Sequence, residues 1–160
     1  MKIFLKMKAW QLFLLLFGAY FTILAGTVLD FPPWVPAILP IGMLMFMAVF
    51  VAWVWSLGTN INRKVPEYVR PNLRLVGFAI AYSSIYMLCA FVFFLLTVGG
   101  YVSDRLLRLI VPFHLLAMAC MFYAIYFVAQ NLIMVKRKEK VGFYECAGPF
   151  FLLWMCPIGV

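Results

Sequence analysis

A chain of 160 residues that is 68% hydrophobic and only 11% charged is far more apolar than an ordinary globular domain. Its formal net charge of +8 is typical of proteins that bind nucleic acid, but the basic residues stand just outside long apolar runs. Topology signals and anionic lipid headgroups place basic residues at those positions. The composition therefore excludes a soluble domain, and the charge placement argues against a nucleic-acid partner.

Four apolar runs, at about 9–29, 37–58, 73–98 and 107–134, are each long enough to cross a bilayer as a helix. No Asp, Glu, Lys or Arg lies in the middle of any run. The first run follows three lysines, as in a secretory signal, but it is longer than the apolar part of such a signal. We therefore predict an all-α polytopic bundle, a single domain over residues 1–160 with four transmembrane helices and an uncleaved first span.

The basic residues alternate between the two sides of these runs. They are frequent before the first run, absent from residues 30–36, frequent again in residues 59–72, sparse between the third and fourth runs, and frequent after the fourth. Because Lys and Arg are retained on the cytoplasmic side, this pattern predicts a cytoplasmic N-terminus and a cytoplasmic segment at residues 135–141.

In the first span, small residues recur every four positions at Gly18, Thr22 and Gly26. Small residues at this spacing let two membrane helices approach closely, so they predict a helix contact with another subunit, with a second copy or within the chain. At the span ends, Arg105 and Arg108 and the cluster Lys136, Arg137 and Lys138 are predicted to contact lipid headgroups.

Polar side chains in the third and fourth spans predict either a polar groove or a network of bonds between helices: Tyr82, Ser83, Tyr86, Tyr123, Tyr126 and Gln130. At about 100° per residue the fourth span has two faces. One carries His114, Met118, Met121 and Ile125, and the opposite one carries Ala119, Tyr123, Tyr126 and Gln130. We predict that the second face packs inside the bundle, because its hydroxyl and amide groups need partners away from lipid.

His114 is the only histidine of the chain and lies early in the fourth span. As a functional group it is a candidate haem ligand, proton acceptor or quinone contact; as a structural one it is a neutral ring bonded to a carbonyl or a water. The four cysteines form neither a C-x-x-C pair nor a zinc spacing. We predict no metal site and no cofactor.

The last segment, residues 142–160, is apolar but short and contains two prolines, which predicts an interfacial or re-entrant helix. A fifth span that begins near Phe143 is the alternative. Phe127-Val128-Ala129 with the basic linker after it, then Ala147-Gly148-Pro149 with the following Phe150–Trp154, and Pro157-Ile158-Gly159 resemble the C-terminal part of small bacterial four-span membrane proteins without an assigned activity. The resemblance implies a bacterial inner membrane and a native chain that continues beyond Val160 into a more polar tail.

These features favour a non-enzymatic membrane protein that acts as a small accessory or structural subunit of a larger complex, with the bilayer and other membrane subunits or a second copy as partners. Two alternatives remain open from the sequence. One is an oligomeric transporter of small solutes or lipids that uses the polar groove, and the other is a haem- or quinone-linked redox subunit that uses His114.

Overall fold

The computed structural model describes residues 35–98, 100–101 and 104–155. In these ranges the chain forms α3 (Val35–Asn62), the short 3-10 helix η1 (Glu67–Val69), α4 (Leu73–Val98), α5 (Asp104–Arg137) and α6 (Phe143–Met155). The all-α prediction is confirmed for this part of the chain. The first predicted span, 9–29, lies outside the described residues, as does its Gly18, Thr22 and Gly26 stripe.

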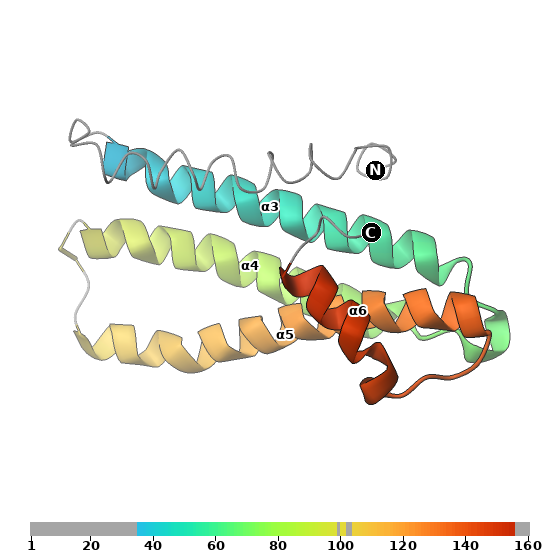
Figure 1. The fold of residues 1–160 in the computed structure, drawn as a ribbon. Coiled ribbons are helices and arrows are strands. Elements are labelled where there is room, and N and C mark those ends of the chain that lie inside the picture. Colours follow the sequence, from blue (N-terminus) through green and yellow to red (C-terminus); the bar gives the residue numbers. More distant parts are fainter. Residues whose placement is uncertain (1–34, 99, 102–103, 156–160) are drawn as a thin grey trace.

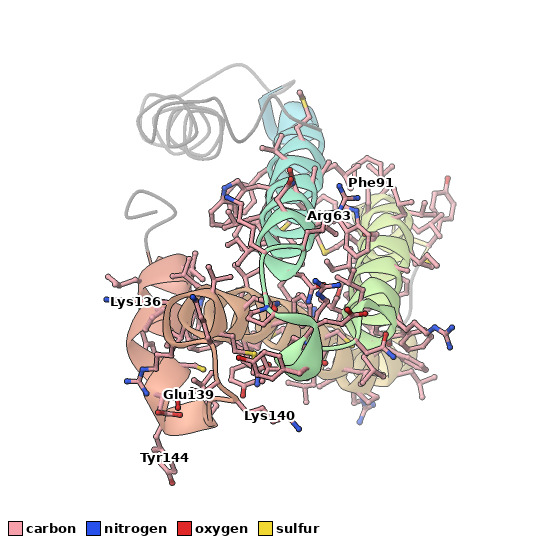
Figure 2. The ribbon with its side chains drawn as sticks, turned by 90° about the vertical axis from the view of Figure 1, so that its right-hand side faces the viewer. Arg63, Phe91, Lys136, Glu139, Lys140 and Tyr144 are labelled. Carbon is pink, nitrogen blue, oxygen red and sulfur yellow. The ribbon has the colours of Figure 1, made fainter. Side chains whose placement is uncertain are left out.

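Three described helices are long and apolar enough to cross a membrane: Leu44–Asn62, Leu73–Thr97 and Arg108–Arg137. They correspond to the second, third and fourth predicted spans and mark the protein as membrane-embedded. Each of them contacts the other two, with α4 running antiparallel to α3 and α5 (Figure 1). Viewed along their axes the three helices form a triangle, with α6 on the outer side of α5 (Figure 2).

The end of the bundle where α3 and α5 finish is closed by residues 59–72 and 130–145, here called the polar cap. Arg70 donates two hydrogen bonds to the Val65 carbonyl and so fixes the turn that carries η1. Lys138 ends α5 in the left-handed region at φ 60°, and its N–H bonds to the Met134 carbonyl, a common helix terminus. The Tyr68 hydroxyl then donates to the Lys138 carbonyl at 2.6 Å, which joins the two halves of the cap.

The best-packed part of the core lies between α3 and α5 near this cap. Phe127 is 2% exposed, and Gly58 of α3 packs against it. A Cβ atom at Gly58 would lie 3.3 Å from Val128 Cγ2, closer than most Cβ atoms approach a neighbour, and 3.6 Å from the Phe127 ring, an ordinary contact distance. The missing side chain of Gly58 therefore lets the two helices approach, as small residues do in membrane bundles.

The final helix, α6, has 13 residues, about 20 Å of helix, which is short for a hydrocarbon core of about 30 Å. It packs against α5, where the Phe122 and Trp154 rings meet edge to face at 4.5 Å and Phe150 is buried. The interfacial or re-entrant helix and the alternative of a fifth span both stay predictions.

Candidate functional site

A tyrosine–histidine pair joins α4 to α5 within the membrane-spanning part of the bundle. The Tyr86 hydroxyl and His114 Nδ1 are 3.0 Å apart, and the two ring centroids are 5.7 Å apart. Either the Tyr86 hydroxyl donates to Nδ1, or Nδ1–H donates to the Tyr86 oxygen, according to the tautomer of the ring. In both cases the bond leaves Nε2 as the ring nitrogen available to a further partner.

The neighbouring polar groups of α4 bond to backbone carbonyls of α5. The Ser83 hydroxyl, which is buried, donates to the Ala117 carbonyl at 3.2 Å, and the Tyr82 hydroxyl reaches the Phe113 carbonyl at 3.5 Å. Tyr82, Ser83 and Tyr86 lie within about one turn of α4. Their partners on α5, Phe113, Ala117 and His114, likewise lie within about one turn. The structure therefore uses Tyr82 and Ser83 to hold α4 against α5, and leaves the Tyr86–His114 pair at an open edge.

That edge is a groove of ≈ 310 Å³ between α3, α4, α5 and the end of α6, here called the lateral groove. It is lined by four methionines, the tyrosine–histidine pair and four further residues: Met47, Met87, Met118, Met121, Tyr86, His114, Ser83, Ala117, Phe122 and Trp154. A second pocket of ≈ 220 Å³ continues it past Tyr86, Met87 and His114 along α4. His114 lies six residues, about 9 Å, inside the apolar part of α5.

The other predicted polar residues do not join this pair. Tyr126 packs against Phe143 at 5.7 Å between ring centroids, the Gln130 amide donates to the Val141 carbonyl at 3.3 Å, and Tyr123 is exposed. The structure thus divides the predicted set: Tyr82, Ser83 and Tyr86 lie between α4 and α5, whereas Tyr126 contacts α6 and Gln130 contacts the linker before it.

The prediction of which face of α5 packs inside the bundle is wrong. Tyr123 and Ala119 of the predicted inner face are exposed, whereas the residues below 9% exposure lie roughly a quarter to a half turn away. They are Ala117, Ala124, Ile125, Phe127, Val128, Ala129, Asn131 and Met134. The physical reason is that close helix packing in a membrane selects small and well-fitting side chains. Tyr126 instead packs against Phe143 of α6, and Gln130 bonds to Val141 in the linker before α6.

Two buried asparagines form a polar contact that the apolar pattern did not reveal. The Asn62 amide donates to Asn131 Oδ1 at 3.2 Å and to the Pro71 carbonyl at 3.1 Å, and the Asn131 amide donates to the Phe127 carbonyl at 2.8 Å. Both side chains are at most 1% exposed. The sequence did carry a signal for this contact, because Asn131 lies inside an apolar run, where its amide is costly unless another group bonds to it.

The basic residues that were predicted to contact lipid headgroups differ in their surroundings. Arg108, Lys136 and Lys138 are exposed, whereas Arg137 forms an ion pair with Glu145. Glu145 also accepts the Gly142 N–H at 2.8 Å, near the first turn of α6. Figure 2 looks onto this end and shows Lys140 and Tyr144 pointing away from the helices. Arg105 belongs to the first turn of α5, outside the side chains that the structure describes.

The bond from Gly142 N–H, together with Arg137, lowers the pKa of Glu145 below its ordinary value. A carboxylate with a depressed folded-state pKa stabilises the fold above its unfolded pKa, and this contribution is lost as the pH falls through the folded value. We therefore expect the start of α6 to lose amide-exchange protection below the ordinary glutamate range, measured by hydrogen exchange corrected for the intrinsic rate. Glu145→Gln should remove this pH dependence, whereas Glu139→Gln, 3.9 Å from Arg137 and exposed, should preserve it. Equal profiles for both variants would contradict the role of Glu145.

The described residues contain no group of three or more His, Cys, Asp or Glu side chains placed to hold a metal ion. Comparisons with protein-family models, with curated proteins and with solved structures gave no match to this chain. The site itself offers a tyrosine–histidine pair in a groove of thioethers and aromatic rings.

Proposed function

We propose that this protein is a non-enzymatic integral membrane protein that binds a small solute in the lateral groove. One observation carries the proposal. Among the described residues, the Tyr86–His114 pair is a bond between two side chains of different membrane-spanning helices, and both side chains line the lateral groove. Most ligand sites are concave and largely apolar, with a few polar groups that orient the ligand, and the lateral groove has this composition.

The polar groups elsewhere support this assignment because their hydrogen bonds are made inside the chain. Gln130 and Asn131 bond to backbone carbonyls, and no buried side-chain nitrogen or oxygen of the described residues lacks a partner. A solute that needs a polar contact at this depth would therefore meet His114. Since the charged groups of the described cap lie at the end of the bundle, such a solute is apolar, or its charge is small enough for neutral ligands to hold.

The test fills the groove. Met118 lines it and is 42% exposed, so Met118→Trp places an indole in the solute space without changing the core. Leu116→Trp is the matched control, because Leu116 is 51% exposed on the same helix but does not line the groove. The protein is extracted with its native lipid in polymer nanodiscs, and retained metals and organic molecules are measured by mass spectrometry. We expect a species that the wild type and Leu116→Trp retain and Met118→Trp loses. The same inventory for all three proteins would contradict the proposal.

A second candidate function, an accessory subunit of a larger membrane complex, is favoured by how little of each span is covered. Only 17–28% of the residues in the three spans are buried within the described structure. Packing in membranes is driven by close contacts, so such open helices gain stability from a neighbouring subunit. A pull-down in mild detergent tests it: a membrane protein recovered in equal amount supports the subunit role, and recovery of the chain alone contradicts it.

For localisation, we propose a bacterial inner membrane with the polar cap in the cytoplasm. Support comes from the gathering of exposed basic residues at one end of the bundle: Arg63, Lys64, Arg70, Arg74, Lys136, Arg137, Lys138 and Lys140. These residues come from two segments far apart in sequence that the antiparallel helices bring together (Figure 2). Positive charge is retained on the cytoplasmic side of membrane proteins, so this end is the one expected to face inward.

A further inference from the structure

The lateral groove gathers soft metal ligands from three helices. Met47 comes from α3, Met87 from α4, and Met118 and Met121 from α5, and all four line the groove with His114. On α5, His114, Met118 and Met121 follow one another at intervals of four and three residues, so they share one face of the helix and line the groove together. The structure adds what the sequence pattern of one helix does not show, namely that Met47 and Met87 face the same space.

The chemistry of these groups selects the ion. Thioether sulfur is a soft donor that suits Cu(I), and imidazole binds copper as well. Magnesium and calcium need carboxylate or carbonyl oxygens, and no carboxylate is among the residues that line the groove. The donors are all neutral, so the bound ion keeps its full charge in a medium where charge is costly. A monovalent ion carries a much smaller penalty there than a divalent one.

Tyr86 gives His114 the orientation that a metal ligand requires. When a histidine binds a metal through one ring nitrogen, the other ring N–H usually donates to a neighbouring oxygen, which fixes the tautomer and the ring plane. The 3.0 Å contact between His114 Nδ1 and the Tyr86 hydroxyl oxygen provides this partner. Nδ1–H then donates to Tyr86, and the Nε2 lone pair is free to bind the ion. Tyr86 is thus a positioning residue and His114 a ligand.

We propose that the solute of the lateral groove is Cu(I), held by His114 Nε2 and by thioethers among Met47, Met87, Met118 and Met121. This inference rests on the proposed function, since it names the chemical class of the solute. Copper enters and leaves the site as the monovalent ion, with no change in oxidation state and no covalent step in the protein.

The test is an anaerobic competition between the purified full-length protein in nanodiscs and a chromophoric Cu(I) chelator. Met118→Leu/Met121→Leu removes two thioethers at nearly constant volume, and Met45→Leu is the matched control, because Met45 lies on α3 outside the groove. We expect one Cu(I) per chain for the wild type and Met45→Leu, about 10- to 100-fold weaker binding for Tyr86→Phe, and a larger loss for the double variant. X-ray absorption of the wild-type complex should show sulfur neighbours around copper, and fewer in the double variant.

The outcomes separate this inference from the proposed function. If the wild type leaves all Cu(I) with the chelator, or if the double variant binds as tightly as the wild type, the copper assignment is wrong. Should the nanodisc inventory still contain an organic species that Met118→Trp loses, the groove binds a solute of another class and only the copper assignment fails. If that inventory shows no difference as well, both proposals fail.

Discussion

Replacing Phe127 with alanine is expected to lower the free energy of unfolding by about 3–5 kcal/mol, as for other buried phenylalanines. Phe127 is 2% exposed and its ring packs on the backbone of α3 at Gly58, so the side chain fills the space where two helices come closest. Lipid cannot refill this space, because the surrounding core residues enclose it. Reversible unfolding in mixed micelles measures the loss.

The matched control is Phe78→Ala on α4. Phe78 is 70% exposed, so the same change removes a ring from the outer surface of the bundle, and lipid replaces the lost contacts. We expect its effect to stay below about 1 kcal/mol, in the range of surface substitutions. Equal losses for the two variants would show that the contact between α3 and α5 is not the centre of the core.

Replacing Asn131 with leucine is expected to lower the free energy of unfolding by about 1–3 kcal/mol, the cost of a buried polar group left without its partner. Asn131 Oδ1 of α5 accepts a hydrogen bond at 3.2 Å from the amide of Asn62 in α3, 69 positions away in the sequence. The leucine removes this acceptor and buries the Asn62 amide beside an apolar group. The same unfolding measurement detects the loss.

A double-mutant cycle with Asn62→Leu isolates the pair from other effects. When both amides are replaced, no side-chain amide remains unsatisfied, although the Pro71 carbonyl loses a donor. The double variant should therefore be more stable than the sum of the single losses predicts, by about 0.5–3 kcal/mol. Additive losses would mean that the two asparagines act separately and that the cap is held by its other bonds.

The lengths and places of the spans could be predicted because bilayer thickness sets how many consecutive apolar residues a helix needs. The predicted runs 37–58, 73–98 and 107–134 fall within α3, α4 and α5, which begin or end up to four residues beyond them. The absence of charge from the middle of each run also follows from the cost of charge in lipid. The structure places the basic residues after α3, at the start of α4 and at the end of α5 at one end of the bundle.

The orientation of each helix about its own axis could not be predicted in the same way. In a soluble helix the apolar face points inward, but here both the lipid-facing and the inward residues are apolar, so the pattern has no strong direction. For α5, the prediction of the inner face relied on Tyr123, Tyr126 and Gln130, and it was therefore wrong. The partner of Gln130 is the Val141 carbonyl, which becomes available only because α6 folds back on α5.

The candidate site was predictable only in part for a related reason. His114 and the α5 methionines share a face that helical spacing reveals, and Tyr86 was singled out as a polar residue. That Tyr86 bonds to His114, and that Met47 and Met87 face the same groove, depends on how three helices are packed. Contacts between residues 28 or more positions apart are set by that packing and are absent from the pattern of any single helix.

The most direct test of the central claim is an experimental structure of the protein in nanodiscs of its native lipid, determined by electron cryo-microscopy with an antibody fragment bound. We predict a compact non-protein density in the lateral groove, in contact with the His114 ring and with Met118. A groove filled by the chain's own residues, or by acyl tails that continue the surrounding lipid without contact to His114, would contradict the claim.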